Sequence, residues 1–247
     1  MLVIGYWLLV IGYFQISKFP NIRYLCVVNY IETNMIRIER FAFNAFQVNT
    51  YILWDETKEC AIIDAGCYGQ AEEDEITGFI KENGLKPVRL LNTHCHIDHI
   101  AGMAFISREY GLKPEAHPGG LEFIKHAKKT GFIYGFDQLE TIKPELPLKE
   151  GDLIHFGHVE LEVVETPGHA DGSVCFICHA GKFVITGDVL FYQSIGRSDL
   201  PTGDYDLLIR SIREKLLTLP RNYKVYPGHG PETTIGYESF SNPFLND

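Results

Sequence analysis

The sequence predicts an α/β (α+β) fold in which two β-sheets pack together and helices cover their outer faces. Two observations support this fold class. Strand-like and helix-like segments alternate in the early part of the chain, and they alternate again in the late part. Each sheet or helix must bury its apolar face against another layer, so two such mixed halves favour packed sheets with helices outside. No Pro-, Gly- or Ser-rich linker separates the halves, which predicts a single domain.

The early part of the chain begins with strands and then mixes in helices. Apolar runs of strand length predict strands over residues 36–43, 48–55, 60–66 and 87–93. Residues 70–84 predict a helix, because their first turn is acidic and Ile76, Phe79 and Ile80 share one face. The other helices expected in this part cover residues 99–111 and 119–131.

The late part predicts two hairpins, a helix and a final strand. The hairpins cover residues 151–169 and 174–188, and the first one turns at Gly157 and His158. An amphipathic helix is expected over 204–219, with its inward face formed by Leu207, Leu208, Ile212 and Leu216. A last strand and turn are expected over residues 223–230.

Charge and cysteine content limit the classes of function. The formal net charge is −10 and no long basic run occurs, which argues against nucleic-acid binding because phosphate contacts need clustered Lys and Arg. Six cysteines in 247 residues do not resemble a disulfide framework, so we expect reduced thiols and a cytoplasmic protein. The segment CFICH, residues 175–179, matches a haem-attachment pattern. Its three-residue offset puts Cys175 and Cys178 on opposite faces of a strand, so we interpret both as buried or half-buried strand residues.

The N-terminal residues 1–34 differ from the rest of the chain. LVIGY occurs twice there, and the apolar run stops by Gln15, which is too short to span a bilayer. Positive side chains follow this run and do not precede it, unlike those of a signal peptide. We expect an extension, 1–34, outside the working fold, with Met35 as the true start, and one domain over 35–247. A weak membrane anchor is the alternative for the extension, and no other membrane association is expected; the intact mass of the native protein tests the first interpretation.

Four potential metal ligands lie within six positions of the segment LLNTHCHIDHIAG, residues 90–102. Alternate side chains of a strand point to the same side, so His94 and His96 can share one metal at the end of strand 87–93. Asp98 and His99, in the loop beyond, can turn toward a second metal. Both metals would need further ligands from elsewhere in the chain.

The chain supplies three such ligands, each at the expected end of a strand and beside a glycine. They are His169 in TPGHADGS, Asp188 in ITGDVLF and His229 in VYPGHGPET. The neighbouring glycines let the backbone turn sharply toward a common point. The isolated histidines are interpreted as surface or loop residues without a role: His117, His126, His155, His158 and His179.

These motifs together resemble those of the metallo-β-lactamase fold, a four-layer αβ/βα sandwich. The resemblance rests on THCHIDH, TPGH, GD and PGHG and covers roughly residues 36–235. Within that fold the chain is most similar to a short form of the glyoxalase II (hydroxyacylglutathione hydrolase) group, through GDVLFYQSIGRSDLPTGD. Glyoxalase II proper adds a C-terminal helical region that helps hold glutathione. This sequence ends about a dozen residues after PGHGPETT, so the substrate stays open.

The resemblance implies a centre of two divalent metal ions. The first ion would take His94, His96 and His169, the second would take Asp98, His99 and His229, and Asp188 would bridge both beside a water or hydroxide. Asp64, in a segment IIDAG that resembles the family's first motif, would orient a ligand. Two such ions with two aspartates and one hydroxide leave the centre net positive, so it can attract and polarise a carbonyl. Histidine and carboxylate ligands suit Zn, with Fe or Mn as alternatives.

The expected activity is hydrolysis of a small thioester, such as an S-acylglutathione, by attack of the bridging hydroxide on the carbonyl. Asp98 and Asp188 would be the catalytic carboxylates. A thiol with a pKa of about 8.5 leaves without a proton donor, and the motifs contain no further acid. The alternatives are a lactonase or esterase on the same dinuclear site, a persulfide dioxygenase with one iron, and a metal-binding protein without activity. A β-lactamase is less favoured, because Asp188 occupies the position expected for a Cys ligand.

Arg197 is the candidate substrate-binding residue. It follows Asp188 by nine residues in the loop IGRSDLPTG, which should stay near the site. Its planar guanidinium could grip a carboxylate of the thiol carrier. The alternative is an ion pair with Asp199, two residues on, which would give Arg197 a structural role.

Overall fold

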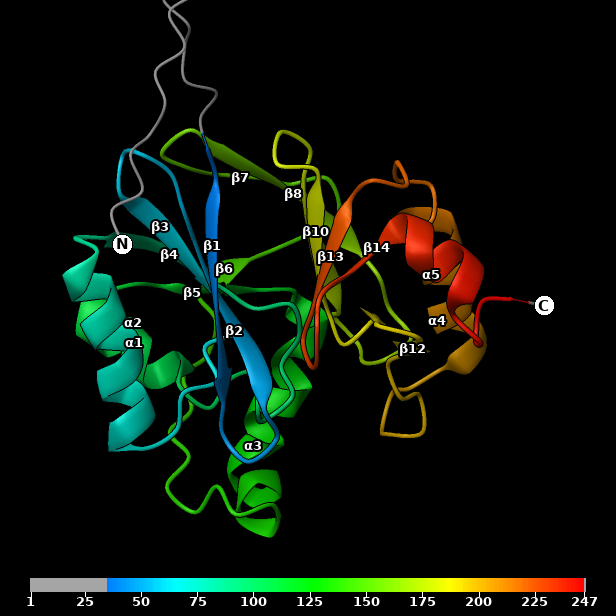
Figure 1. The fold of residues 1–247 in the computed structure, drawn as a ribbon. Coiled ribbons are helices and arrows are strands. Elements are labelled where there is room, and N and C mark those ends of the chain that lie inside the picture. The colour runs from blue at the N-terminus through cyan, green and yellow to red at the C-terminus, as the bar shows by residue number, and fades with distance from the viewer. Residues whose placement is uncertain (1–34, 247) are drawn as a thin grey trace, which may run out of the picture. The chain divides into compact units, whose positions relative to one another are not determined.

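The computed structural model describes residues 35–246, which form two six-stranded sheets with helices on the outer face of each (Figure 1). The expectations for residues 1–34 lie outside the described residues. Within 35–246, no helix is both long enough and apolar enough to cross a membrane.

The first sheet has the strand order β1-β2-β3-β4-β5-β6. Its strands are β1 (Arg37–Phe43), β2 (Val48–Trp54), β3 (Glu59–Ile63), β4 (Lys86–Leu91), β5 (Pro114–Ala116) and β6 (Leu146–Pro147). The pairs β1/β2 and β2/β3 are antiparallel, and the pairs from β3 to β6 are parallel. Parallel neighbours need crossover connections. These contain α1 (Gln70–Glu82), α2 (Met103–Tyr110), the 3₁₀ turn η1 (Pro118–Gly120) and α3 (Leu121–Ile133).

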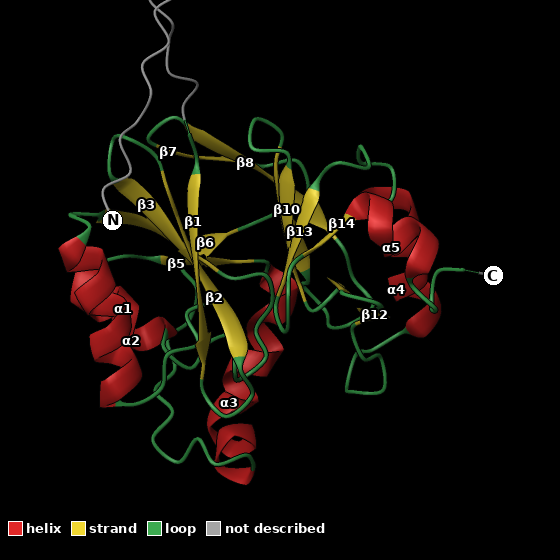
Figure 2. Cartoon of the chain, viewed as in Figure 1, coloured by secondary structure: helices red, strands yellow, loops and turns green. Residues whose placement is uncertain are grey.

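The second sheet has the order β14-β13-β10-β9-β8-β7, and the sheets are distinguished from the helices in Figure 2. Its strands are β7 (Leu153–Phe156), β8 (Val159–Glu165), β9 (Val174–Cys178), β10 (Phe183–Gly187), β13 (Lys224–Pro227) and β14 (Thr233–Thr234). A separate small ribbon joins β11 (Leu190–Phe191) and β12 (Ser194–Ile195). The outer elements are α4 (Tyr205–Ser211), the π-helical turn η2 (Ile212–Leu216) and α5 (Ile235–Ser241).

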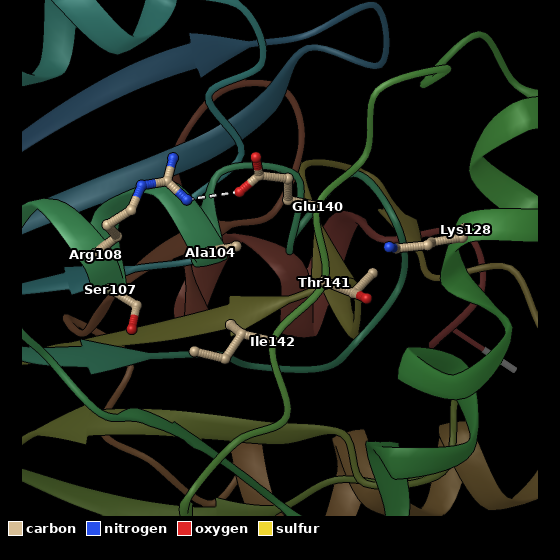
Figure 3. Close-up of a pocket in the computed structure, with 7 residues that line it drawn as sticks. All are labelled: Ala104, Ser107, Arg108, Lys128, Glu140, Thr141 and Ile142. Carbon is tan, nitrogen blue, oxygen red and sulfur yellow. Dashed lines mark hydrogen bonds and ion pairs between the residues drawn. The ribbon is translucent and has the colours of Figure 1, made fainter.

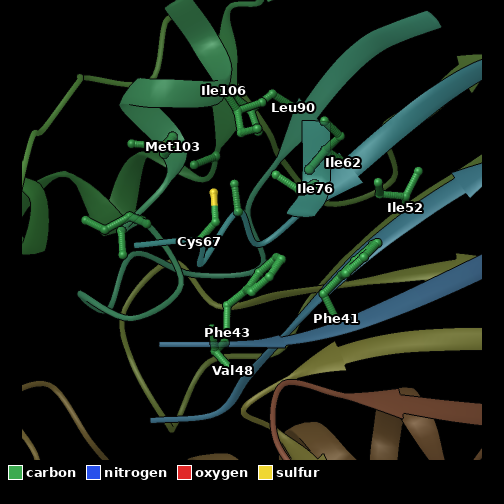
Figure 4. Close-up of a cluster of buried hydrophobic side chains, with 14 of the residues drawn as sticks. Phe41, Phe43, Val48, Ile52, Ile62, Cys67, Ile76, Leu90, Met103 and Ile106 are labelled. Atoms are coloured by element: carbon green, nitrogen blue, oxygen red, sulfur yellow. The ribbon is translucent and has the colours of Figure 1, made fainter. Parts of the chain in front are cut away.

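Three apolar clusters separate the four layers. One lies between the first sheet and its helices (Figure 4), one lies between the two sheets, and one lies between the second sheet and its outer elements. Strand β2 is buried along its whole length because it contributes to two clusters. Ile52 packs on the helix side, whereas Tyr51 and Leu53 point between the sheets, as the two-residue period of a strand requires. The predicted four-layer αβ/βα sandwich is therefore confirmed.

Most expected elements are present, and the cysteine interpretation holds. Cys175 and Cys178 are both free and buried, one on the helix side of the second sheet and the other between the sheets. The hairpin turn at Gly157 and His158 joins β7 to β8. Helix α5 and the short strands β5, β6, β11, β12 and β14 were not expected. Strands of two or three residues carry too few side chains to form a pattern.

Two helices differ most from their expected bounds, whereas α1 and α3 lie within two residues of theirs. The helix expected over 99–111 begins only at Met103, because the preceding residues form tight turns: the His99 amide donates to the His96 carbonyl at 3.1 Å. Gly102 packs so closely on Cys67 that an added Cβ would lie 2.3 Å from its sulfur. The single helix expected over 204–219 is divided in the structure. It is α-helical over α4 and then becomes the π-helical turn η2. The late start of α2 leaves Asp98 and His99 in a loop.

Candidate metal centre

The predicted ligands lie at one edge of the molecule, where the carboxyl ends of strands from both sheets meet. His94 follows β4, Asp188 follows β10 and His229 follows β13. His169 follows β8, which runs in the same direction as β10 because both are antiparallel to β9. Residues more than a hundred positions apart in the sequence are therefore brought to one point, as is common at the carboxyl ends of parallel strands.

Three histidines form the first group. His96 Nδ1 lies 3.1 Å from His94 Nε2 and 3.0 Å from His169 Nε2. All three nitrogens fall within 4.8 Å of one another. Ligand atoms at 2.0–2.1 Å around a tetrahedral ion are about 3.3 Å apart, so the spacing is close to that of a filled site. The ring of Phe123 packs edge-on against His96 with centroids 4.9 Å apart, which gives this group an apolar wall.

Asp98, His99 and His229 form the second group. The Asp98 Oδ2 atom lies 3.2 Å from His229 Nε2 and 3.6 Å from His99 Nε2. The ligand atoms of all three again fall within 4.8 Å of one another. Asp98 and His99 are buried and His229 is partly exposed. This group contains a carboxylate of its own, which the first group does not.

Asp188 lies between the two groups. Its Oδ1 atom is 3.3 Å from His99 Nε2, while its Oδ2 atom is 3.5 Å from His229 Nε2 and 3.7 Å from His169 Nε2. A carboxylate in this position faces both sets of nitrogen atoms. Gly228 makes room for it, because a Cβ on Gly228 would lie 2.2 Å from Asp188 Oδ1.

The ring nitrogens that face away from the centre are held by hydrogen bonds. His169 Nδ1 lies 2.7 Å from the Arg197 carbonyl, and His229 Nδ1 lies 3.0 Å from the Phe46 carbonyl. Because a carbonyl only accepts, both Nδ1 atoms carry the proton and leave Nε2 available toward the centre. His99 Nδ1 lies 3.0 Å from Asp64 Oδ2. These partners fix the tautomers and the ring orientations.

Asp64 follows β3, and its side chain bonds to Thr93, which follows β4 and immediately precedes His94. Its Oδ1 accepts from the Thr93 amide at 2.7 Å, and its Oδ2 accepts from the Thr93 hydroxyl at 2.7 Å as well as facing His99. Its backbone has a φ of 53°, which is uncommon for a residue with a side chain. The predicted orienting position of Asp64 thus corresponds to direct contact with His99 and with the residue before His94.

The electrostatics of the two groups differ. Burial lowers the pKa of His94 and His169, and burial together with the nearby His169 lowers the pKa of His96 to about 4. In the second group burial also acts to lower the pKa of His229. The hydrogen bonds of His229 to Asp188 and Asp98 outweigh this effect of burial and raise the His229 pKa to about 9.

The carboxylates of the centre are ionised. Burial acts to raise their pKa values, but His99 and hydrogen bonds from His229 hold the pKa of Asp98 below, and that of Asp188 well below, the usual range. The first group therefore presents neutral imidazole lone pairs near neutral pH, while the second presents carboxylates and protons that a cation could displace.

Two buried polar atoms support the presence of a cation site between these residues. His99 Nε2 and Asp188 Oδ1 face each other at 3.3 Å without forming a hydrogen bond, and neither has another hydrogen-bond partner, although both atoms are shielded from solvent. Leaving buried polar atoms unpaired costs about 1–3 kcal/mol each, which a metal ion would offset. Nitrogen donors in one group and mixed nitrogen and carboxylate donors in the other also match the ligand chemistry of Zn, Fe and Mn.

Sequence reasoning missed the backbone carbonyls of Phe46 and Arg197. A main-chain acceptor leaves no mark in the residue type, so no signal in the sequence could have identified them. The Arg197 side chain itself forms a two-pronged ion pair with Asp199, at 2.8 Å from Nε to Oδ1 and 2.8 Å from Nη2 to Oδ2, and both side chains are exposed.

A surface cavity of about 380 Å³ lies apart from the ligand residues (Figure 3). Its lining contains none of them and consists of Ala104, Ser107, Arg108, Lys128, Glu140, Thr141 and Ile142. Arg108 Nη1 and Glu140 Oε2 form an ion pair at 2.7 Å across this cavity, so the two charges neutralise each other. The convergence of titratable groups at the metal centre makes that centre, and not this cavity, the candidate functional site.

Comparison with known proteins finds relatives that cover most of the chain. The chain is 39% identical over 210 residues to the probable metallo-hydrolase YqgX of Bacillus subtilis, covering 84% of this chain and 96% of that protein. It is 37% identical over 213 residues to the hydroxyacylglutathione hydrolase GloC of Haemophilus influenzae, covering 85% and 99%.

Solved structures show the same fold. The BLEG-1 B3 metallo-beta-lactamase matches with a TM-score of 0.77 and 32% identity, covering 85% of this chain and all of that one. TTHA1623 in a di-iron-bound form matches with a TM-score of 0.73 and 34% identity, covering 84% and 100%. The sequence profile described as "Metallo-beta-lactamase superfamily" matches residues 43–229, which is most of the chain. The protein belongs to the metallo-β-lactamase superfamily.

Proposed function

We propose that this protein is a dinuclear metal-dependent hydrolase of thioesters. The observation that carries the proposal is the position of Asp188, whose two oxygens face the histidines of both groups. His94, His96 and His169 would hold one ion and Asp98, His99 and His229 the other, with Asp188 shared. Zn is the ion we expect; the di-iron form of TTHA1623 supports Fe as the main alternative, with Mn the further one.

Two bound divalent ions would supply a Lewis acid for a carbonyl oxygen and a water acidic enough to be hydroxide near neutral pH. The chain's own residues would do the rest. Asp98 Oδ2 and Asp188 are ionised and face the space between the groups, so they can accept hydrogen bonds from an attacking water and orient it. The bonds from His169 and His229 to main-chain carbonyls would keep the ring nitrogens fixed during the reaction.

The leaving group favours thioesters over amides. The carboxylates that touch the histidines of the centre are Asp64, Asp98 and Asp188. Asp98 and Asp188 are ionised, and Asp64 accepts hydrogen bonds from the Thr93 amide and hydroxyl. None of these three is a free acid that could protonate an amine. A thiolate needs no such proton, because a thiol has a pKa of only about 8.5. The likeness to GloC, named for hydroxyacylglutathione hydrolysis, supports the same substrate class.

Two alternatives to a thioesterase remain. A lactonase or esterase would use the same seven residues, and a persulfide dioxygenase would use one iron. The likeness to BLEG-1 adds β-lactams to the substrates that should be assayed. Metal number separates the dioxygenase from the hydrolases, and only assays separate the hydrolases from one another.

The deciding experiment is elemental analysis of the purified protein followed by hydrolysis of a thioester, a lactone and a β-lactam. We expect two ions per chain and the highest kcat/KM on the thioester. Asp188→Ala should lower hydrolysis on the order of a thousandfold and weaken both ions, because it removes the shared anionic ligand. One ion per chain after metal supplementation, or near-normal activity of Asp188→Ala, would show that the dinuclear assignment is wrong.

A further inference from the structure

An exposed pair of aromatic rings stands beside the metal centre. We call Phe46 and Tyr134 the aromatic rim; their ring centroids are 5.9 Å apart in an edge-to-face arrangement. Phe46 lies in the turn between β1 and β2 and is 40% exposed, and Tyr134 lies just after α3 and is 52% exposed. The neighbouring Phe132 and Ile133 are 72% and 69% exposed. Large apolar side chains that are left in water and contact each other, as Phe46 and Tyr134 do, can mark a binding surface.

The Phe46 ring rests on a buried aromatic base. Its centroid is 5.7 Å from the ring of Phe136, in a stacked arrangement. Phe136 is buried and packs edge-on against Tyr68, with centroids 4.9 Å apart. One face of the Phe46 ring is therefore fixed by packing, while its exposed part is free to meet another apolar group.

The backbone of Phe46 is tied to the second group of the metal centre. Its carbonyl accepts from His229 Nδ1 at 3.0 Å, and its amide donates to Asn44 Oδ1 at 2.9 Å. The Asn44 side-chain amide in turn donates to the carbonyl of Asp98 at 3.1 Å. Asn44 and Gln47 both have a positive φ, which holds the turn in one conformation. The position of the Phe46 side chain relative to His229 is thus set by a hydrogen bond and a constrained turn.

Tyr134 continues the rim from Phe46 through the edge-to-face contact of the two rings. The rim is tied to the second group through the Phe46 carbonyl, which accepts from His229 Nδ1.

We propose that the aromatic rim binds an aromatic or bulky apolar group of the substrate and so determines which thioesters are accepted. This inference rests on the proposed thioesterase function. A reacting carbonyl between the two groups must send one substituent, acyl or thiol, past the side chains that flank them. Rings offset or edge-on to another ring gain contact energy beyond burial alone, so a phenyl group is the expected ligand chemistry.

The test compares four thioesters that combine an acetyl or phenylacetyl group with a small neutral thiol or a benzyl thiol. We expect Phe46→Ala and Tyr134→Ala to lower kcat/KM about five- to tenfold on phenyl-bearing substrates and less than about twofold on acetyl with the small thiol. If kcat/KM falls only on the phenylacetyl substrates, the acyl side contacts the rim; if it falls only on the benzyl thiol substrates, the thiol side does. Phe244→Ala, at a phenylalanine of similar exposure, 42%, is the matched control and should change none of the values.

A second measurement separates this inference from the proposed function. Binding of two stable ketones, in which a CH₂ group separates the carbonyl from the sulfur, is measured calorimetrically, one ketone with a phenyl group and one with a methyl group. Weaker binding of the phenyl ketone alone in Phe46→Ala supports the rim even if the wild type hydrolyses no thioester. Equal losses on all four thioesters with unchanged ketone binding would overturn it, as would loss of metal from Phe46→Ala, since the atom that His229 contacts is a main-chain carbonyl.

Discussion

The two groups of the candidate metal centre each contain three potential ligands but differ in charge. The first contains only histidines, and burial keeps their pKa values low. The second contains Asp98 and two histidines, and contact with carboxylates raises the pKa of both. A metal ion held by the first group would therefore depend on Asp188 for an anionic ligand, whereas one held by the second would also have Asp98.

The two groups are also supported differently. The first group is oriented by the Thr93 hydroxyl, which lies 3.1 Å from His94 Nδ1, and by the Arg197 carbonyl, in the loop that follows β12. The second is oriented by Asp64, at the end of β3, and by the turn between β1 and β2. A shared centre made from two separately supported groups should lose its ions one at a time. The predictions that follow test this difference, beginning with the largest expected effect.

Removing one histidine from each group should leave one ion instead of two. His96→Ala should empty the first position and His229→Ala the second, and each should lower hydrolysis on the order of a thousandfold because the reaction would need both ions. Elemental analysis and kcat/KM measure the two effects. His155→Ala is the control, since His155 is exposed, lies in the edge strand β7 and belongs to neither group. Two ions and normal activity in His229→Ala would contradict the two-group description.

Asp64→Asn should weaken the second ion more than the first. The substitution keeps the shape but removes the charge that faces His99, and loss of such a supporting partner typically costs 10- to 100-fold in metal affinity, so we expect roughly that loss at one position. Competition with a chelator, followed by counting the retained ions, gives the affinity of each position. Equal weakening of both ions would mean that Asp64 acts mainly through Thr93 and not through His99.

Asp55 follows β2, at the end of the strand away from the metal centre. We expect its substitution to change the stability of the protein and not its metal content. Asp55 accepts from the Thr57 amide at 2.8 Å and from the His158 amide at 2.5 Å, so it ties the first sheet to the β7–β8 hairpin of the second. Burial acts to raise the Asp55 pKa, but these hydrogen bonds and that of the Thr57 hydroxyl lower it below 3.8. A carboxyl with a depressed folded pKa stabilises the protein above its unfolded pKa, and the contribution disappears as pH falls through the folded value.

Asp55→Asn should therefore lower the free energy of unfolding by about 1–2 kcal/mol at pH 7, with a smaller difference in acid. Urea unfolding at a series of pH values, with metal content measured in parallel, is the appropriate measurement. Two ions should remain bound at pH 7. Loss of metal from this variant would show that the two ends of the sandwich are coupled and that the effects of Asp64→Asn cannot be assigned to contact alone.

The smallest effect is expected at Arg197. The sequence led to the proposal that Arg197 binds a carboxylate on the thiol carrier, whereas in the structure Arg197 forms an ion pair with Asp199. If it binds substrate, Arg197→Lys should lose severalfold in kcat/KM on a glutathione thioester and little on a neutral thiol with the same acyl group, because Lys lacks the planar fork. Arg197→Ala should lose more. Equal losses on both substrates with a lowered melting temperature would assign Arg197 to loop structure.

The sequence by itself determined the four-layer fold and the identity of the candidate ligands. Strand and helix periods follow from which side chains must be buried, and they are local. His94 and His96 could be paired from spacing alone because a strand fixes the direction of alternate side chains. The strand ends before His169, Asp188 and His229 could be recognised for the same reason.

Only the tertiary structure decided what surrounds those ligands. The carbonyls of Phe46 and Arg197, the unpaired atoms of His99 and Asp188, and the ring contact between Phe46 and Tyr134 join segments separated by 28 to 183 positions or depend on burial. Main-chain acceptors have no residue signature, and the pKa of a histidine depends on charges brought near it by folding. The sequence therefore predicted which residues form the candidate centre, while the packing of the two sheets set their charge, their orientation and the surface that a substrate would meet.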